Sequence, residues 1–455
     1  MRETTTAADP NILKLLHNHM QACGPRTARE IAQTLGLPIA TTRKHLNLLV
    51  EASQLSCGEY RPNGADLEYC APLILARLHR ESLRRAREQI APVDATQFAA
   101  FLPAWQGAGH TSSARHALEA LLHLPLTREQ WHAILSARLG PNGAGAVDAL
   151  TSRGAFEWRG AGKGHLELVE AGAPNQAPRQ VAGYGTEQVR SLLQRHGALF
   201  AADVARRLSR TEQPLTLADV DQALDLLEDA GLAANDLLSH TGRWSTVPEQ
   251  ADSAGLLEAY VEALLRRYGV VSREIVRAEK GPFSWAQAER LLKLWEWRGR
   301  ALRGDFVRDL SGPQFARREA VDLLRERTTH REPVLLAWQD PANAWGLILP
   351  LAAPRGKGRF ILLLAGQPLL TIAGWGKDLR PGPAWAAEHA QAAAGALRGL
   401  ALHSPNGVAA LERWQGGSIL MSPLAAALRE AGFSRSGIRL LCRQPAADRA
   451  LPVAV

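Results

Sequence analysis

One arrangement of elements recurs along this chain and limits what it can fold into. Each time, an apolar-periodic helix ends near a glycine, a short helix and a longer helix follow, and a strand-like tail closes the segment. The arrangement occurs in residues 11–60, 187–246 and 256–310, and residues 94–170 contain a poorer copy. It is typical of a winged helix, in which a helix-turn-helix precedes a β-hairpin and the third helix faces the DNA major groove. Several copies in one chain favour a platform for nucleic acid.

The recurring segments divide the chain into six predicted parts of an α+β fold. We expect tandem winged-helix modules, a small β-barrel-like module and a C-terminal α/β segment. Short apolar runs after residue 312, separated by Pro, Gly and Asn, indicate the strands of the β module. The predicted parts are a winged helix at 1–68, a basic helix with a divergent winged helix at 69–180, winged helices at 181–248 and 249–312, the β-rich barrel-like module at 313–382 and the α/β segment at 383–455.

The charge of the chain favours a polyanionic partner. It has 53 lysines and arginines against 45 aspartates and glutamates, a formal charge of +8 and a pI of about 9.6. DNA is the expected partner, although charge alone is as consistent with an ordinary basic protein. Arginine, the better bidentate ligand of phosphate and guanine, greatly outnumbers lysine.

Several other classes of protein are not expected. There is no run of 18 apolar residues and no apolar N-terminal signal, so we expect a cytoplasmic protein without membrane association. The four cysteines form no CxxC pair, and no second ligand cluster follows His17, His19 and Cys23, so neither a metal site nor another cofactor is expected. Gly164 follows Lys163 where a phosphate-binding loop needs Ser or Thr, so no ATPase motor is expected.

The third helix of the first segment carries the predicted contacts to DNA. Thr27 and Glu30 form a capping-box pair for the second helix, Gly36 ends that helix, and Pro38 opens the third. The first turns of a recognition helix face bases and phosphates. The residues in those turns are Thr41, Thr42, Arg43, Lys44 and His45. The alternative is an ordinary surface helix with a solvated charged face.

A second basic surface is predicted on residues 73–90, which form a long amphipathic helix. Four arginines spaced three, four and three residues apart lie on one face of it. They are Arg77, Arg80, Arg84 and Arg87. Such a stripe is suited to follow a phosphate backbone. Pairing with an acidic subunit and simple solvation are the alternatives.

Several strings resemble one known family, the large helicase-related proteins, Lhr. The strings are YCAPLILARLHRESLRRAREQIAPVDATQFAAFLPAWQ at 69–106, HGALFAADVARRL at 196–208, GRWSTV at 242–247, LLRRYGVVSREI at 264–275, GDFVRDLSGPQFARREAVDLLR at 304–325 and DPANAWG at 340–346. Their order and spacing resemble the C-terminal region of Lhr over nearly the whole chain from about residue 69. The helicase motor of that family is absent from this sequence.

The resemblance implies a fold and an activity. The C-terminal region of Lhr is an array of winged helices with a β-barrel module and is similar to the winged-helix DNA glycosylases. The resemblance further implies DNA as a partner, assembly into a homotetramer, a helicase as a working partner, and uracil-DNA glycosylase activity that depends on an aspartate near the C-terminus. Asp448 is the only aspartate in the last twenty residues, so its position marks it as the implied catalytic residue.

The chemistry of glycosidic cleavage gives an independent criterion. Positive charge develops on the sugar, and a carboxylate or a water held by one stabilises it, after the base has left the stack. Asp340 is a second catalytic candidate because it lies in a loop between two strand-like runs, although Asp-Pro-Ala-Asn is also typical of a turn. Two functions therefore stay open. The chain is either a DNA-binding repair glycosylase that removes a damaged base such as uracil, or a non-catalytic DNA-binding and oligomerisation platform for a helicase or transcriptional regulator.

Overall fold

The computed structural model describes residues 9–61, 66–88, 91–108, 114–140, 142–248, 252–326, 332–355, 358–404 and 407–443. The chain divides into two compact units, Met1–Ile90 and Ala91–Val455. Within the described ranges, no helix is both long enough and apolar enough to cross a membrane.

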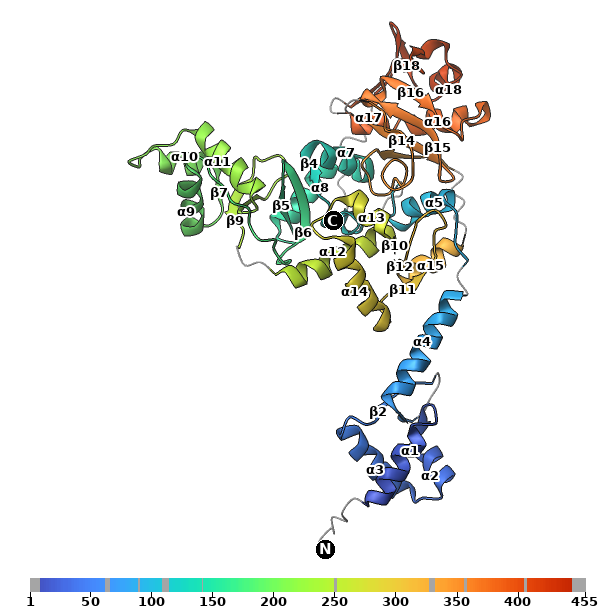
Figure 1. Ribbon diagram of the computed structural model, residues 1–455. Coiled ribbons are helices and arrows are strands. Elements are labelled where there is room, and N and C mark those ends of the chain that lie inside the picture. The colour runs from blue at the N-terminus through green and yellow to red at the C-terminus, as the bar shows by residue number, and fades with distance from the viewer. Residues whose placement is uncertain are drawn as a thin grey trace. The chain divides into compact units, whose positions relative to one another are not determined.

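The first unit contains a small helical core closed by a sheet and followed by one long helix (Figure 1). Leu16, Ile31 and Leu46, one from each of its first three helices, are fully buried together. The elements are α1 (Pro10–Met20), β1 (Arg26–Thr27), α2 (Ala28–Leu35), α3 (Ile39–Glu51), β2 (Ser56–Gly58), β3 (Glu68–Cys70) and α4 (Pro72–Glu88), and the strands are ordered β1-β3-β2. The predicted capping box is confirmed, because Thr27 Oγ1 accepts from Glu30 N at 3.2 Å and the Glu30 carboxylate accepts from Thr27 N at 2.7 Å.

The same order of elements occurs three more times in the second unit. We number the four copies repeats 1 to 4; each has a helix, a short strand, two helices and a hairpin, and its third strand lies between the other two. Repeat 2 contains α6 (Ala114–Glu119), β4 (Leu126–Thr127), α7 (Arg128–Leu139), α8 (Gly143–Ser152), β5 (Phe156–Gly162) and β6 (His165–Glu170). Repeat 3 contains α9 (Thr186–His196), β7 (Leu199–Phe200), α10 (Ala201–Leu208), α11 (Leu217–Asp229), β8 (Ala233–Asn235) and β9 (Arg243–Thr246). Repeat 4 contains α12 (Ser253–Tyr268), β10 (Val270–Val271), α13 (Arg273–Glu279), α14 (Trp285–Trp297), β11 (Leu302–Gly304) and β12 (Gln314–Ala316).

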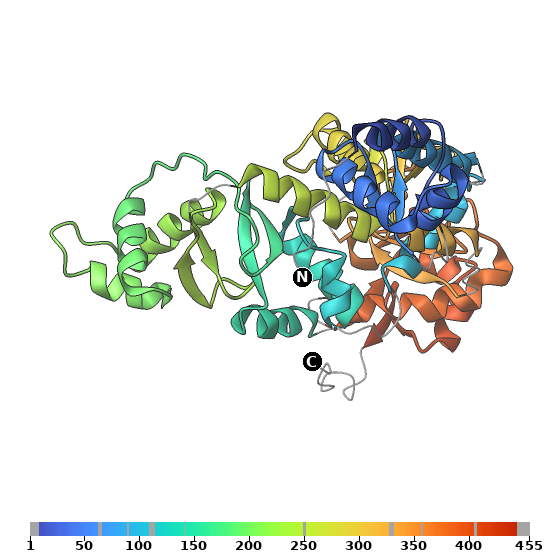
Figure 2. The ribbon, with the colours of Figure 1, turned by 90° about the horizontal axis from the view of Figure 1, so that it is seen from below.

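Repeat 3 packs its third helix, α11, against the hairpin of repeat 2 (Figures 1 and 2). The two backbones approach so closely that a Cβ at Gly160 in β5 would lie 1.6 Å from the Glu228 carbonyl oxygen. Beside this contact, the Asp229 carboxylate accepts from Gly164 N at 2.7 Å, and Arg179 donates to the Asp229 carbonyl oxygen at 3.0 Å. The C-terminal end of α11 is therefore an internal packing surface.

The C-terminal part of the second unit corrects the predicted barrel. Six of its described strands form an open sheet, ordered β13-β14-β15-β16-β18-β19. They are β13 (Val334–Ala337), β14 (Phe360–Leu364), β15 (Gln367–Ala373), β16 (Asp378–Pro381), β18 (Arg413–Trp414) and β19 (Gly417–Ser418). The edge strand β19 has two exposed residues, too few to pair along β13 at the other edge and close the sheet. Helices cover the apolar residues instead, as Leu362 and Leu370 pack in one core with Leu397 of α16 (Ala390–Leu397).

The remaining elements complete the second unit. A separate sheet ordered β17-β21-β20 joins β17 (Val408–Leu411), β20 (Ser434–Ser436) and β21 (Arg439–Arg443). The further helices are α5 (Ala95–Trp105), α15 (Arg318–Arg325), η1 (Gly374–Gly376), η2 (Ala387–His389), α17 (Leu400–His403), η3 (Ile419–Met421) and α18 (Ala425–Glu430). One apolar core includes Trp131 of α7, Trp158 of β5 and Phe360 of β14. This shared core fixes repeat 2 against the C-terminal sheet and so positions the site described next.

Candidate functional site

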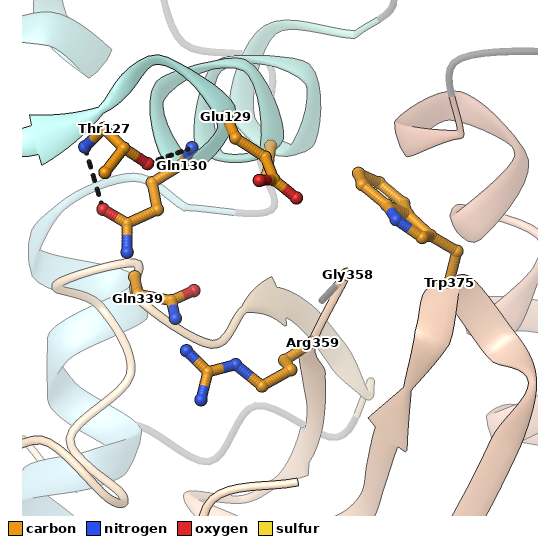
Figure 3. Close-up of a pocket in the computed structure, with 8 residues that line it drawn as sticks. Thr127, Glu129, Gln130, Gln339, Gly358, Arg359 and Trp375 are labelled. Atoms are coloured by element: carbon orange, nitrogen blue, oxygen red, sulfur yellow. Dashed lines mark hydrogen bonds between the residues drawn. The ribbon is translucent and has the colours of Figure 1, made fainter. Parts of the chain in front are cut away.

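A small cavity lies where α7 meets the C-terminal sheet (Figure 3). Its volume is about 130 Å³. That is close to the size of a single six-membered ring, since an apolar cavity of about 150 Å³ can hold benzene. The lining combines amides, a carboxylate, a guanidinium and an indole, from Thr127, Glu129, Gln130, Ala133, Gln339, Gly358, Arg359 and Trp375.

The N-terminus of α7 fixes which group of Gln130 faces the cavity. Thr127 caps the helix by accepting from Gln130 N at 3.3 Å, and Gln130 Oε1 accepts in return from Thr127 N at 2.9 Å. This reciprocal pair is a capping box. Because Oε1 is used by the cap, the amide end that points toward Gln339 is the Nε2 donor (Figure 3). The cap therefore presents a hydrogen-bond donor to the cavity.

The indole of Trp375 bounds the cavity from the C-terminal sheet. Trp375 has φ +60, a left-handed conformation that costs a non-glycine residue about 1–3 kcal/mol and is enriched at functional sites. Its amide donates to the Gly358 carbonyl oxygen at 2.9 Å, and a Cβ at Gly358 would lie 2.3 Å from the indole. The ring also packs on Phe360 with 5.4 Å between centroids. Both neighbours hold the indole in place.

The remaining polar groups enter from two different elements. Gln339 follows β13, and Arg359 immediately precedes β14; the two segments are joined by a hydrogen bond of 2.9 Å from Trp338 N to the Arg359 carbonyl oxygen. Glu129 lies in the first turn of α7 and directs its carboxylate toward the same space as the indole (Figure 3). The arrangement offers amide donors, a cation and a carboxylate around a space of ring size.

Asp340, the second predicted catalytic residue, adjoins this cavity but does not line it. Its side chain has no exposed surface and forms a bidentate pair with Arg138, with Nε to Oδ2 at 2.9 Å and Nη2 to Oδ1 at 2.6 Å. Oδ1 also accepts from Ala342 N at 2.8 Å. Arg138 further donates to Gln106 Oε1 at 2.5 Å. Both Asp340 oxygens are thus engaged in holding the turn that carries Gln339, and its catalytic role stays a prediction.

Asp448, the first predicted catalytic residue, lies outside the described residues. Within the described ranges, no group of three or more His, Cys, Asp or Glu side chains is arranged to hold a metal ion.

The predicted recognition helix, α3, turns two of its five named residues inward. Thr42 has no exposed surface, and its hydroxyl donates to the Pro38 carbonyl oxygen at 3.1 Å. His45 is 4% exposed, and its Nε2 accepts from Asp9 N at 3.0 Å. The prediction that Thr42 and His45 contact DNA directly is therefore corrected. Both residues lie on the same side of the helix as the buried Leu46 and Leu49.

On α3, fewer of the predicted DNA-contact residues are exposed than the sequence pattern indicates, because Thr42 and His45 are buried. Arg43 and Lys44 are exposed and Thr41 is half-buried. In α4, Arg77 and Arg80 are exposed. Arg84 and Arg87 belong to the same helix, but their side chains lie outside the described part of the chain.

Sequence reasoning missed the cavity. The Thr127-x-x-Gln130 spacing marks a helix start, and the glycines on either side of Trp375 mark a turn, so local signals for both segments exist. Their meeting depends on the packing of α7 against β13, which links residues about 200 positions apart, as the Arg138–Asp340 pair does. A single sequence carries no signal for such a long-range contact.

Comparison with known proteins confirms the resemblance drawn from the sequence strings. A protein-family model, described as "Large helicase-related protein, winged-helix domain", matches residues 250–334 of this chain. These residues contain repeat 4. The chain is 26% identical to the Lhr helicase/uracil glycosylase of Escherichia coli (strain K12), covering 93% of this chain and 33% of that protein. It is also 26% identical to the Lhr helicase/probable uracil glycosylase of Mycolicibacterium smegmatis, covering 96% of this chain and 34% of that protein. The chain thus spans about a third of the length of these curated relatives.

Among solved structures, the DNA glycosylase AlkZ of Streptomyces sahachiroi matches 71% of this chain and 99% of its own chain, with a TM-score of 0.47 and 15% sequence identity.

Proposed function

We propose that this chain binds DNA and hydrolyses the N-glycosidic bond of a damaged pyrimidine, with uracil as the first substrate to test. The ring-sized cavity with its amides, carboxylate and indole carries this proposal. The names of the two Lhr relatives, which include uracil glycosylase, support the choice of substrate. A base in a duplex reaches such a cavity only after it has left the stack, which costs least for a mismatched or damaged base.

The cavity residues have complementary roles in recognising the extruded base. The Trp375 indole stacks on the ring, and the Gln130 and Gln339 amides donate to the carbonyl oxygens of a pyrimidine. A space of about 130 Å³ matches one ring, so we expect a pyrimidine to fit it better than the two fused rings of a purine. Arg359 pairs with the phosphate or with the departing base as it gains negative charge.

Glu129 is the carboxylate that we assign to the chemistry. The bond between sugar C1′ and the base nitrogen breaks, and the electron pair leaves with the base. Water forms the new C1′–O bond and gives its proton to Glu129, which passes it on to the base. The negative charge of Glu129 also stabilises the positive sugar in the transition state.

The two aspartates marked by the sequence remain alternatives to Glu129. Asp448 is tested by the variant Asp448→Asn, which should abolish excision with little change in DNA affinity if that residue is catalytic. For Asp340 we propose a holding role, because Arg138 and Ala342 N occupy its oxygens.

DNA binding is proposed to use the repeats as tandem winged helices. The exposed Arg43, Lys44, Arg77 and Arg80 supply cations for phosphate contacts. Assembly of several copies, or work alongside a helicase, would bring further basic surfaces to the same DNA. Sedimentation of the purified chain, alone and with DNA, tests assembly.

The deciding experiment incubates the purified chain with duplexes that contain uracil, an alkylated base or no lesion, and then cleaves abasic sites with alkali. We expect strand breaks at uracil only. Excision of an alkylated purine would contradict the single-ring cavity. Tight DNA binding without any break would instead support the non-catalytic platform.

A further inference from the structure

A second surface with its own chemistry lies on α14, the third helix of repeat 4. Helical residues spaced four, three and four apart share a face, and one such face of α14 is exposed along its length. We call it the α14 stripe; it consists of Ala286, Arg290, Lys293, Leu294 and Trp297. The core contacts of the helix come from other positions, including Leu292 and Trp295, which are fully buried or nearly so.

The stripe ends in an exposed aromatic ring, and two exposed arginines follow it in the chain. Trp297 is 64% exposed, unusual for so large an apolar side chain, and Leu294 beside it is 40% exposed. Arg298 and Arg300 follow in the turn and are also exposed. The Arg300 guanidinium lies 4.1 Å from the centroid of the Trp295 ring, so the turn is held against the end of the helix.

The charge of the stripe favours a nucleic acid over a protein surface. Two carboxylates lie on the same helix: Glu289 pairs with Lys293 at 2.9 Å, and Glu296 is buried. Lys293 is 50% exposed in this pair and Glu289 is half-buried; an ion pair at the surface contributes little to stability, so a phosphate can compete for the lysine. The equivalent helix of repeat 3, α11, carries Asp219, Asp221 and Asp225 instead. The two helices occupy the same place in their repeats but differ in charge. The cationic, aromatic stripe is therefore a property of α14 and not of the repeat.

We propose that the α14 stripe binds a single-stranded segment of DNA. One base stacks on the exposed indole of Trp297, while Lys293 and Arg290 pair with phosphates of the neighbouring nucleotides. Arg290 and Trp297 are about 10 Å apart along the helix axis, which corresponds to about three stacked nucleotides. Stacking of this kind tolerates any sequence because every base has a π face. The site is independent of the cavity and of base excision.

The experiment measures binding of the full chain to a fluorescent oligothymidine of about 12 nucleotides, within the size range of single-strand sites, by anisotropy. We expect Trp297→Ala to weaken binding about tenfold, and Trp297→Phe, which keeps a ring, to retain most of the affinity. Tyr184→Ala is the matched control, because Tyr184 is an aromatic side chain of similar exposure, 65%, outside the repeats; it should have no effect.

Salt dependence tests the two charged residues of the stripe, and sedimentation tests whether a second copy of the chain binds it instead of DNA. Arg290→Gln and Lys293→Gln should each lower the slope of log affinity against log salt by about 0.7, the value for one phosphate on a single strand. Unchanged affinity in Trp297→Ala, or equal losses for an oligothymidine and for a blunt duplex, would overturn the proposal. So would a change of sedimentation in Trp297→Ala without any change in DNA affinity, because that result would make the stripe a contact between two copies of the chain. Failure of base excision has no bearing on these outcomes.

Discussion

The buried pair between Arg138 and Asp340 is the residue-scale feature that most affects the interpretation of activity data. Arg138 is 3% exposed and Asp340 has no exposed surface. Removing one partner leaves an uncompensated buried charge, so Arg138→Met should lower the free energy of unfolding by about 3–5 kcal/mol. Arg206→Met is the control, because Arg206 and Asp203 form an exposed pair that should contribute at most about 1 kcal/mol. Denaturant unfolding measures both, and equal effects would contradict the structure.

A double variant separates structure from catalysis at the same site. Arg138→Met with Asp340→Leu replaces the ion pair by apolar groups, which should recover most of the lost stability. If Asp340 only holds the turn beside Gln339, the double variant should excise uracil at a measurable rate. A folded but wholly inactive double variant would restore Asp340 as a catalytic residue.

In repeat 1, the contact between Glu30 and Arg61 gives stability a defined dependence on pH. Hydrogen bonds from Arg61 and from Thr27 N lower the pKa of Glu30 from 4.5 to about 2. Because the folded pKa is the lower one, the stabilisation is present above about pH 4.5 and is lost as the pH falls toward 2. Hydrogen exchange of residues 56–61 and 66–70 should therefore be faster in Glu30→Gln than in wild type at pH 6. The difference should shrink on acidification, and a difference that grows would contradict the pairing.

At the scale of elements, Gly160 is the position in repeat 2 at which the backbone of repeat 3 packs most closely. Any Cβ there meets the Glu228 carbonyl oxygen at 1.6 Å, and backbone cannot move aside cheaply. Gly160→Ala should therefore lower the melting temperature by several degrees. The control is Gly145→Ala in α8, where a Cβ meets nothing within 4 Å and alanine favours the helix by about 0.5–1 kcal/mol. An equal response of the two variants would show that this contact does not form in solution.

The element order was predictable from the sequence to a greater extent than the role of each helix. Local signals such as Thr27 with Glu30, and Gly36 in a left-handed conformation, place the ends of helices. The same local pattern could not show that His45 turns inward to bind Asp9 N, because the charge pattern of α3 alone suggests an exposed face. The sequence pattern also predicted a barrel where the sheet is open. Apolar strands that are covered by helices have the same sequence pattern as apolar strands that close into a barrel.

For the whole molecule, DNA affinity should depend strongly on salt. If several phosphates are neutralised, affinity should fall on the order of a hundredfold or more between about 50 and about 200 mM salt. Arg43→Gln and Lys44→Gln should each reduce the salt slope for duplex DNA by about 0.9. Filter binding over a salt series measures these slopes, and binding that is insensitive to salt would contradict an electrostatic DNA platform.

The central claim is that the cavity beside α7 holds the damaged base and that Glu129 acts on it. The most direct test is single-turnover excision of uracil from a duplex by wild type and by Glu129→Gln, together with the affinity of both for the same duplex. Since Glu129 is exposed at the cavity rim, the substitution should leave folding intact. We predict that the excision rate falls about a hundredfold or more while duplex affinity stays within about twofold. Excision at the wild-type rate by Glu129→Gln would contradict the account.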